Sequence, residues 1–528
     1  MNKLQVLDCT LRDGGYCNNF KFGYINIKKI IENLIEANID IVECGFLSDK
    51  INYDANYTQF NTIAQIVEML PNNRTSGKFV AMMNYGEFDE DKLPQRTSKT
   101  IDGVRVAFHK KNKQEALKVC EKIQNKGYDV FVQAMVSVSY TDNEFLELIS
   151  QVNKLKPYAF YIVDSFGTMN CSDLTRLFYL IEHNLDRDIV IGFHSHNNMQ
   201  LSFANAQTLL GIQTNRKLII DSSVYGMGRG AGNLNTELFV GYLNETQGAC
   251  YDIKPLLVVI DEVLNDFYTK NPWGYSLSNY LSAFHNAHPN YAKFLDEKKT
   301  LAVKDVNEIF SMMEEERKFT YDKEYIEELY LRYMAADGVF EEHMSELLSN
   351  LRDKKILLIA PGKSSVDEKN QILEFSKNNS VVPISVNFDY TALNVEYIFV
   401  SNIRRFKTLN QEQRKKCIVT SNIATDNVYL KTQYKELLND EEMVKDNAGL
   451  MAIKFLIDCG VDEIYLAGFD GYSKDSSENY ADSCMEMVVR NAVLDAMNKG
   501  MTKNIRKYAT QIRLNFITKP KHINLFDN

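Results

Sequence analysis

The sequence lacks the features that would point to an oxidising, membrane-bound or nucleic-acid-binding setting. Its nine cysteines in 528 residues are scattered without a C-x-x-C pair, which fits reduced thiols in a cytoplasm better than a disulfide framework. No apolar run approaches the roughly 20 residues that a membrane-spanning helix needs. Residues 1–6 lead straight into a strand pattern, so we expect no signal peptide. The net charge of -10 argues against broad nucleic-acid binding. These absences predict a cytoplasmic protein with no membrane span and no nucleic-acid partner.

What the sequence does contain is a long alternation of apolar runs and amphipathic helix patterns. Its length predicts two or three domains, and its 45% hydrophobic and 25% charged residues are typical of globular proteins. Eight continuous apolar runs predict strands that are buried on both faces, at residues 4–10, 39–46, 78–84, 103–109, 129–138, 159–164, 188–194 and 217–224. Eight β/α units in this length predict an α/β protein with an N-terminal (β/α)₈ TIM barrel, which we bound at residues 1–300.

Polar residues interrupt or end these apolar strands, where barrels of this kind carry their active sites. Arg12 and Asp13 follow the first strand, Glu43 lies in the second, and His194 and His196 end the seventh. Side chains two residues apart on a strand face the same side, so the two imidazoles can face one point. Two nitrogens and a carboxylate, for which Asp13 is the candidate, would suit a divalent metal. A histidine pair without metal and a plain Arg12–Glu43 ion pair are the alternative interpretations.

Four motifs in this order resemble the DRE-TIM metallolyase superfamily, the HMGL-like barrels. That superfamily includes 3-hydroxy-3-methylglutaryl-CoA lyase, isopropylmalate synthase and 4-hydroxy-2-oxovalerate aldolase, to which the detail is most similar. The residues that carry the resemblance are Leu11-Arg12-Asp13-Gly14, Glu43, His194-Ser195-His196 and Gly230-Ala231-Gly232-Asn233.

The resemblance implies a carbon–carbon lyase or aldolase that acts on a 2-oxo acid and an aldehyde through a pyruvate-type enolate. A divalent metal, Mn²⁺ or Mg²⁺, would be bound by a carboxylate, two imidazoles and an amide oxygen, namely Asp13, His194, His196 and Asn233. Arg12 would hold the developing enolate oxygen, and Glu43 would fix Arg12 through a charge-assisted pair.

One position departs from the family pattern. Tyr16 stands where the aldolase has a histidine that takes part in proton transfer, and a phenol with a pKa of about 10 is a poor base. The acceptor substrate can therefore differ. Residues after the barrel that could serve as acid or base, or merely pack there, are Tyr275, Tyr280, His285 and His288. Ser165 and Tyr275 are candidate substrate-binding residues, and the loop residues Tyr225 and Arg229 are expected to close over the substrate.

The second half of the chain predicts a helical connector at 301–352 and a Rossmann-like open α/β domain at 353–528. Its strand candidates are residues 355–360, 382–386, 397–400, 417–420 and 463–466, and the tail 503–528 is expected to add one more strand. This domain resembles bacterial sialyltransferase-like nucleotide-binding domains. The residues that would bind a sugar nucleotide are Gly362, Ser364, Asn387, Asn402 and Asp470. Only His522 follows Asp470 as a histidine, so a binding or degenerate domain is the alternative to an active transferase.

Several functions stay open on the sequence alone. The leading one is a metal-dependent aldolase, with a role in cell-surface polysaccharide metabolism if the second domain binds a sugar nucleotide. The alternatives are a bifunctional enzyme with a sugar-nucleotide-dependent transferase domain, a Claisen-type acyl-CoA synthase, and a binding protein on an inactive barrel. Retention of the costly polar cluster argues against an inactive barrel. We also expect a homo-oligomer.

Overall fold

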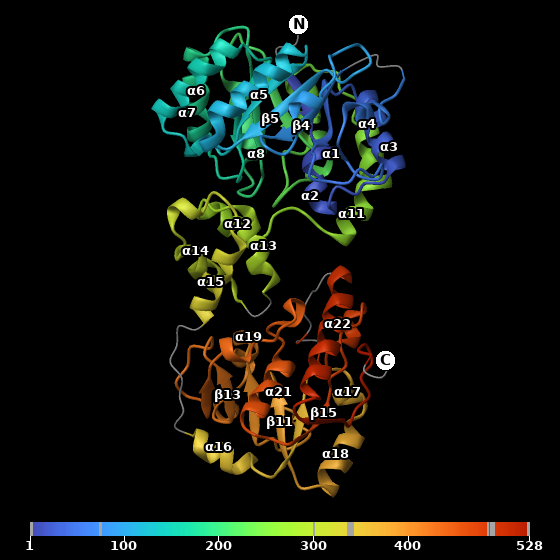
Figure 1. Cartoon of the computed structure of the whole chain (residues 1–528), viewed down its shortest axis with the longest axis vertical. Helices are drawn as coiled ribbons and strands as arrows, with labels where there is room; N and C mark the ends of the chain where they lie inside the picture. The colour runs from blue at the N-terminus through green and yellow to red at the C-terminus, as the bar shows by residue number, and fades with distance from the viewer. Residues whose placement is uncertain are drawn as a thin grey trace. The chain divides into compact units, whose positions relative to one another are not determined.

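The computed structural model of the chain describes residues 4–72, 77–298, 301–334, 343–482, 485 and 491–524. The chain forms two compact units (Figure 1). The first unit comprises Met1–Lys293 and Glu314–Tyr321, and the second comprises Phe294–Met313 and Asp322–Asn528. The division into three domains at residues 1–300, 301–352 and 353–528 remains a prediction. The boundary at residue 300 lies outside the described residues.

The first unit is a closed barrel of parallel strands, as predicted. Each of the eight predicted strands is present: β1 (Leu4–Asp8), β2 (Ile41–Leu47), β4 (Lys78–Asn84), β5 (Gly103–Phe108), β6 (Asp129–Ala134), β7 (Ala159–Asp164), β8 (Val190–Ser195) and β9 (Leu218–Ser222). The barrel closes because β1 pairs with both β2 and β9. All eight carboxyl ends therefore meet at one rim, where the sequence places its polar residues.

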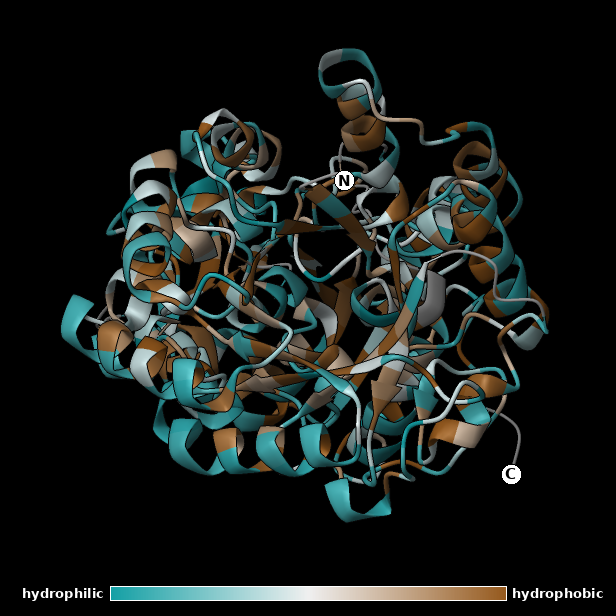
Figure 2. Cartoon of the chain, turned by 90° about the horizontal axis from the view of Figure 1, so that it is seen from above, coloured by the Kyte–Doolittle hydropathy of each residue, from teal (hydrophilic) through white to brown (hydrophobic). Residues whose placement is uncertain are grey.

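Amphipathic helices cover the outside of this barrel. They are α3 (Tyr24–Glu36), α4 (Ile63–Val67), α5 (Lys113–Asn125), α6 (Asp142–Leu155), α7 (Cys171–Asn184), α8 (Ser202–Gly211) and α9 (Thr236–Gln247). In α6 the capping box of Thr141 and Glu144 fixes the first turn. Figure 2 shows apolar strands and helices that alternate between apolar and polar residues, as expected for strands buried on both faces.

Strand β2 bends beside the future site. A short strand that was not predicted, β3 (Gln59–Phe60), pairs with β2, and the register between β2 and β4 shifts between Glu43 and Phe46. Gly45 has φ +146°, and a Cβ atom there would lie 2.2 Å from the carbonyl oxygen of Thr58. A glycine is thus required where the chain before β3 approaches this bulge.

The second unit contains an open parallel sheet, as predicted. Its strands are β10 (Lys355–Ile359), β11 (Val381–Val386), β12 (Tyr397–Val400), β13 (Cys417–Thr420), β14 (Leu430–Thr432), β15 (Glu463–Ala467) and β16 (Arg513–Phe516), of which β14 was not predicted. The strand order is β14-β13-β12-β11-β10-β15-β16, so strands β11 to β14 extend the sheet on one side of β10 and strands β15 and β16 extend it on the other. Its main helices are α18 (Lys369–Asn378), α21 (Ala448–Asp458) and α22 (Asn491–Tyr508).

Helices also join the two sheets in sequence. They are α10 (Lys254–Val259), α11 (Asn265–Lys270), α12 (Leu277–Phe284), α13 (Pro289–Glu297), α14 (Val303–Ser311), α15 (Lys323–Met334) and α16 (Met344–Leu351). The chain crosses between units within α13 and returns to the first unit at Glu314–Tyr321. Across the described ranges, helices long and apolar enough to cross a membrane are absent.

Candidate active site

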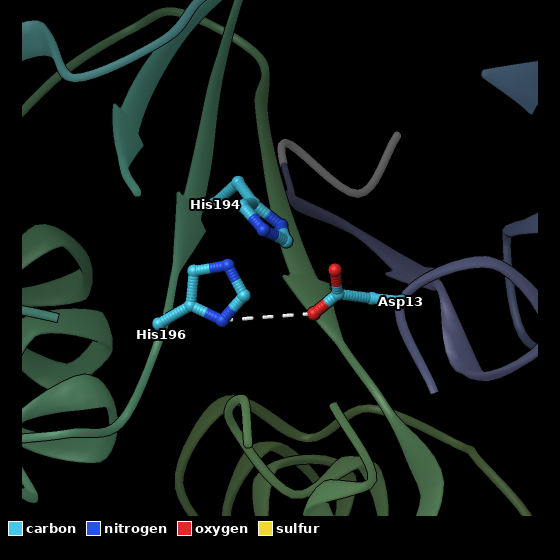
Figure 3. A group of neighbouring side chains, drawn as sticks. All are labelled: Asp13, His194 and His196. Carbon is cyan, nitrogen blue, oxygen red and sulfur yellow. Dashed lines mark ion pairs between the residues drawn. The ribbon is translucent and has the colours of Figure 1, made fainter. Parts of the chain in front are cut away.

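Three predicted metal ligands meet at the rim of the barrel. Asp13 ends the short helix α1 (Thr10–Asp13) after β1, His194 lies in β8, and His196 directly follows β8. Their ligand atoms all lie within 4.8 Å of one another, and all three side chains are buried. Figure 3 shows both imidazoles turned toward the carboxylate. The period-two spacing on β8 and the turn after β1 together produce this cluster.

The charges around the cluster set the protonation states that a metal requires. Burial by itself would raise the pKa of the Asp13 carboxyl, but nearby charges, above all that of Arg12, hold it well below its usual range. Burial lowers the pKa of His196 to about 3, and the charge of Asp13 opposes this only in part. At neutral pH the carboxylate is therefore ionised and this imidazole is neutral, as metal ligands must be.

Two buried atoms beside Asp13 show that the residues present fit a divalent cation. Asn233 donates from Nδ2 to Oδ2 of Asp13 at 2.6 Å, but its Oδ1 has no hydrogen-bond partner among the described residues. Nδ1 of His196 also has no such partner and lies 3.6 Å from Oδ2 of Asp13. Buried polar atoms without partners are costly. A cation that prefers oxygen and imidazole ligands, such as Mn²⁺ or Mg²⁺, would satisfy both.

A buried chain of alternating charges supports the cluster. Arg12 contacts Glu43 through Nε and Oε2 at 2.8 Å, and Arg105 contacts Glu43 through Nη1 and Oε1 at 2.9 Å. Arg105 also pairs with Asp221, whose Oδ2 lies 2.9 Å from Nδ1 of His194. A carboxylate on Nδ1 orients the ring and leaves Nε2 of His194 for a metal. The charge chain thus runs from Arg12 to the first imidazole.

Arg12 retains one free hydrogen-bonding group. Its Nη1 donates to Oδ1 of Asp13 at 2.6 Å and its Nε is held by Glu43. Its Nη2 is buried and lacks a hydrogen-bond partner in the described part of the chain. A fixed guanidinium with an unused donor beside the cluster of Asp13, His194 and His196 is suited to bind an oxygen that becomes negative.

Two members of the charge chain, Arg105 and Asp221, were not singled out from the sequence. The signal was available, because each is a charged residue within an apolar strand, as Glu43 is. Both are buried, and the guanidinium of Arg105 lies 4.9 Å from the centre of the Tyr161 ring. Charged groups inside buried strands need partners. Several charged residues in neighbouring apolar strands therefore indicate a buried network of ion pairs.

The glycine-rich loop leaves no room for a side chain at Gly228. A Cβ atom there would lie 2.4 Å from Nδ2 of Asn233 and 2.8 Å from Oδ2 of Asp13. We expect Gly228→Ala to lower the affinity for Mn²⁺ by about 10- to 100-fold, because disturbed support of metal ligands has effects of this size. Titration calorimetry with Mn²⁺ measures it. Gly211→Ala is the control, since a Cβ there meets nothing within 4 Å. Unchanged affinity in Gly228→Ala would contradict this geometry.

The other predicted barrel residues lie around this centre or away from it. Arg229 donates from Nη2 to the carbonyl oxygen of Ser165 at 3.0 Å, lies 3.5 Å from Nε2 of His196, and is 5.6 Å from the Tyr16 ring centre. Desolvation of its hydroxyl group raises the pKa of Tyr16, and the charges of Arg229 and Arg12 oppose this only in part. The residue as a whole is 40% exposed. Oγ of Ser165 accepts from a backbone amide at 2.9 Å. Tyr275 is 56% exposed, before α12.

The residues predicted to bind a nucleotide lie at the carboxyl edge of the second sheet. Ser364 donates from its backbone nitrogen to Oδ2 of Asp470 at 2.7 Å, and its hydroxyl also bonds this carboxylate. A Cβ atom on Gly362 would lie 2.8 Å from the same oxygen. The Asp470 carboxylate therefore already accepts a hydrogen bond from the backbone N–H group of this turn that would otherwise bind a phosphate.

The remaining predicted nucleotide ligands also make hydrogen bonds within the chain. Asn387 accepts from the backbone nitrogen of Ser401 at 3.2 Å, and Asn402 caps α19 (Ile403–Thr408) by accepting from that of Arg404 at 2.9 Å. His522, which the sequence could not place, donates from its backbone nitrogen to the carbonyl oxygen of Asp470 at 2.7 Å. Sugar-nucleotide binding there remains a prediction.

The barrel is similar in sequence to known proteins. Residues 3–259 match the HMGL-like family model, which confirms the predicted resemblance of the barrel. A 4-hydroxy-2-oxovalerate aldolase of Geobacillus genomosp. 3 is 25% identical over 245 residues, covering 46% of this chain and 70% of that protein. An oxaloacetate decarboxylase of Mycobacterium tuberculosis is 24% identical over 284 residues, covering 53% and 81%. The solved HMG-CoA lyase of Brucella melitensis is 14% identical, with a TM-score of 0.40, and covers 48% of this chain and 95% of that one. The predicted resemblance of residues 353–528 to sialyltransferase-like domains remains a prediction.

Proposed function

Because residues 3–259 form an HMGL-like domain, we propose that the barrel is a metal-dependent carbon–carbon lyase of the aldolase type. Its substrate would be a 4-hydroxy-2-oxo acid, cleaved to an aldehyde and the enolate of pyruvate. The carrying observation is the buried Asp13, His194 and His196 cluster beside the unused Nη2 of Arg12. A cation held by these three residues and Oδ1 of Asn233 would, when bound, polarise the 2-oxo carbonyl as a Lewis acid.

The protein's own groups have distinct tasks in this proposal. Cleavage next to a carbonyl leaves negative charge on the enolate oxygen, and Nη2 of Arg12 is the donor that would stabilise it. Glu43 prevents Arg12 from rotating, since it fixes Nε at 2.8 Å. Because the guanidinium is held before the reaction, little reorganisation is needed as charge develops.

Tyr16 would act as a proton donor rather than as a base. Its pKa is raised, so the phenol is neutral at physiological pH. Arg229 lies 5.6 Å from its ring and would stabilise a transient phenolate. A donor at this place could return a proton to the methylene carbon of the enolate and release pyruvate. This assignment depends on the proximity of Tyr16 to Arg229, which itself contacts Ser165.

Exchange of the pyruvate methyl protons with solvent deuterium tests the proposal directly. The protein is stripped with EDTA, incubated with pyruvate in deuterium oxide, and compared with samples to which Mg²⁺ or Mn²⁺ is returned. We expect exchange only with the ion present, measured by proton NMR after removal of protein and metal. Samples with the ion but no protein are the control. A wild-type protein that binds the ion yet catalyses no exchange would contradict the enolate mechanism.

A further inference from the structure

A segment from beyond the barrel packs onto the end of β7, next to the proposed active site. The ring centre of His288 lies 5.7 Å from that of Phe166, edge to face, and the ring of Phe319 stacks on Phe166 at 6.2 Å. The backbone nitrogen of His288 donates to the carbonyl oxygen of Lys318 at 2.8 Å. Phe166 directly follows Ser165, whose carbonyl accepts from Arg229. All these residues belong to the first unit, so this segment forms part of the barrel rim.

The hydrogen bonds of His288 define which of its nitrogens can donate. Nδ1 accepts from the backbone nitrogen of Asn290 at 3.2 Å, so in a neutral ring the proton lies on Nε2. Burial, together with the charges of Arg229 and His109, lowers the pKa of His288 to about 3. The ring is thus neutral under physiological conditions and presents an N–H donor. Because its side chain is only half-buried, this donor can reach a ligand.

Arg229 contacts both the Asp13, His194 and His196 cluster and the end of β7, on which His288 packs. One end of its guanidinium lies 3.5 Å from Nε2 of His196 and 3.0 Å from the carbonyl oxygen of Ser165. Its charge also acts on His288 and on His109, which follows β5. Burial and nearby charges, including that of Lys111 on His109, lower the pKa of both imidazoles, so both rings are neutral at physiological pH. A neutral imidazole among these cations can still donate a hydrogen bond to an oxygen of the substrate.

We propose that His288 positions the second half of the substrate, by donating a hydrogen bond from Nε2 to the oxygen on carbon 4 of the 4-hydroxy-2-oxo acid. As the bond between carbons 3 and 4 breaks, the proton of this hydroxyl group passes to water and the oxygen becomes the carbonyl oxygen of the released aldehyde. A neutral imidazole that donates to such an oxygen orients the bond to be cleaved without transferring a proton itself. The inference rests on the proposed function, and it adds a residue that acts on the aldehyde half only.

Two reactions of the same protein separate this role from the enolate chemistry. Pyruvate exchange involves the 2-oxo half, whereas cleavage of 4-hydroxy-2-oxopentanoate, followed by pyruvate release, involves both halves. We expect His288→Phe, which keeps an aromatic ring beside Phe166, to lower kcat/KM for cleavage by about 10²-fold, as loss of one positioned donor does. Exchange should stay within about threefold of wild type, a difference of less than 1 kcal/mol. His288→Gln, whose amide can donate from a similar place, should recover part of the cleavage.

Controls decide between a positioning and a merely structural role. His183→Gln, on the outer helix α7, should change neither reaction, and thermal unfolding should show that His288→Phe is folded. Equal cleavage by His288→Phe and wild type would overturn the inference, as would a parallel loss of exchange and cleavage in a folded variant. If wild type exchanges pyruvate protons but cleaves no 4-hydroxy-2-oxo acid, the inference is wrong and the enolate proposal stands. If wild type does neither, both are wrong.

Discussion

Asp13→Asn is expected to abolish pyruvate proton exchange, with a loss of at least about 10³-fold. The substitution removes the only carboxylate of the described cluster that could bind the ion directly. It also removes the negative charge that pairs with Nη1 of Arg12 at 2.6 Å. A Lewis-acid ion supplies several kcal/mol of transition-state stabilisation, and each 1.36 kcal/mol corresponds to about tenfold in rate. Exchange and Mn²⁺ binding by calorimetry should fall together.

Asp8→Asn provides the matched control for loss of a buried carboxylate near the same helix. Asp8 ends β1, and its carboxyl bonds the backbone nitrogen of Thr10 and the hydroxyl of Thr236 rather than the cluster. Burial raises its pKa to about 6, so an amide replaces a group that is easily neutralised. We expect Asp8→Asn to lose less than about tenfold in exchange. If Asp13→Asn keeps wild-type Mn²⁺ affinity, the proposed metal centre is wrong.

Arg105→Met should produce the largest loss of stability, about 3–5 kcal/mol in the free energy of unfolding. Arg105 is fully buried and neutralises both Glu43 and Asp221. Removal of one member leaves uncompensated charge in the barrel interior, which has a cost of this size. Arg105→Lys keeps a charge but cannot form both contacts, so we expect an intermediate loss. Urea unfolding of EDTA-treated protein measures both variants.

The pH dependence of this loss provides an independent check. Burial by itself would raise the pKa of Asp221, but the charge of Arg105 and the hydrogen bond with His194 lower it below its usual value. In wild type, this contribution to stability is present above the unfolded pKa and is lost as the pH falls. In Arg105→Met, the charge of Arg105 no longer opposes burial, so burial raises the pKa of the Asp221 carboxyl and favours its protonated form. The difference in unfolding free energy should therefore shrink between pH 7 and pH 5. A constant difference would show that the charge pairing is not its cause.

The parts of the fold that depend on local pattern could be predicted from the sequence. Continuous apolar runs gave all eight barrel strands, because strands buried on both faces need apolar side chains at every position. The period of two predicted that His194 and His196 face one side of β8. The rule that barrel sites lie at the carboxyl ends of strands predicted that Asp13 lies near them, and the three residues do form a cluster. The short strands β3 and β14 were missed because two or three residues carry too little pattern.

The parts that depend on distant contacts could not be predicted. The carboxylate of Asp470 bonds Ser364 across 106 residues, and nothing local in either segment indicates that pairing. His522 lies beside Asp470 for the same reason, since the turns after β15 and β16 meet only in the folded sheet. Two rings near His288 come from the turn after β7 and from residues 314–321, which belong to the barrel unit although a stretch of the second unit precedes them.

This interleaving of the two units decides how the protein can be dissected. A gene fragment that stops at residue 293 would encode the whole cylinder of strands but leave out Phe319, whose ring covers Phe166. A fragment that continues to residue 321 would restore that ring and also carry α14, which belongs to the second unit and contacts α15. The first fragment therefore lacks part of the barrel unit, and the second includes part of the other unit. A short synthetic bridge from residue 293 to residue 314, which omits the intervening helix, is the deletion that follows the architecture.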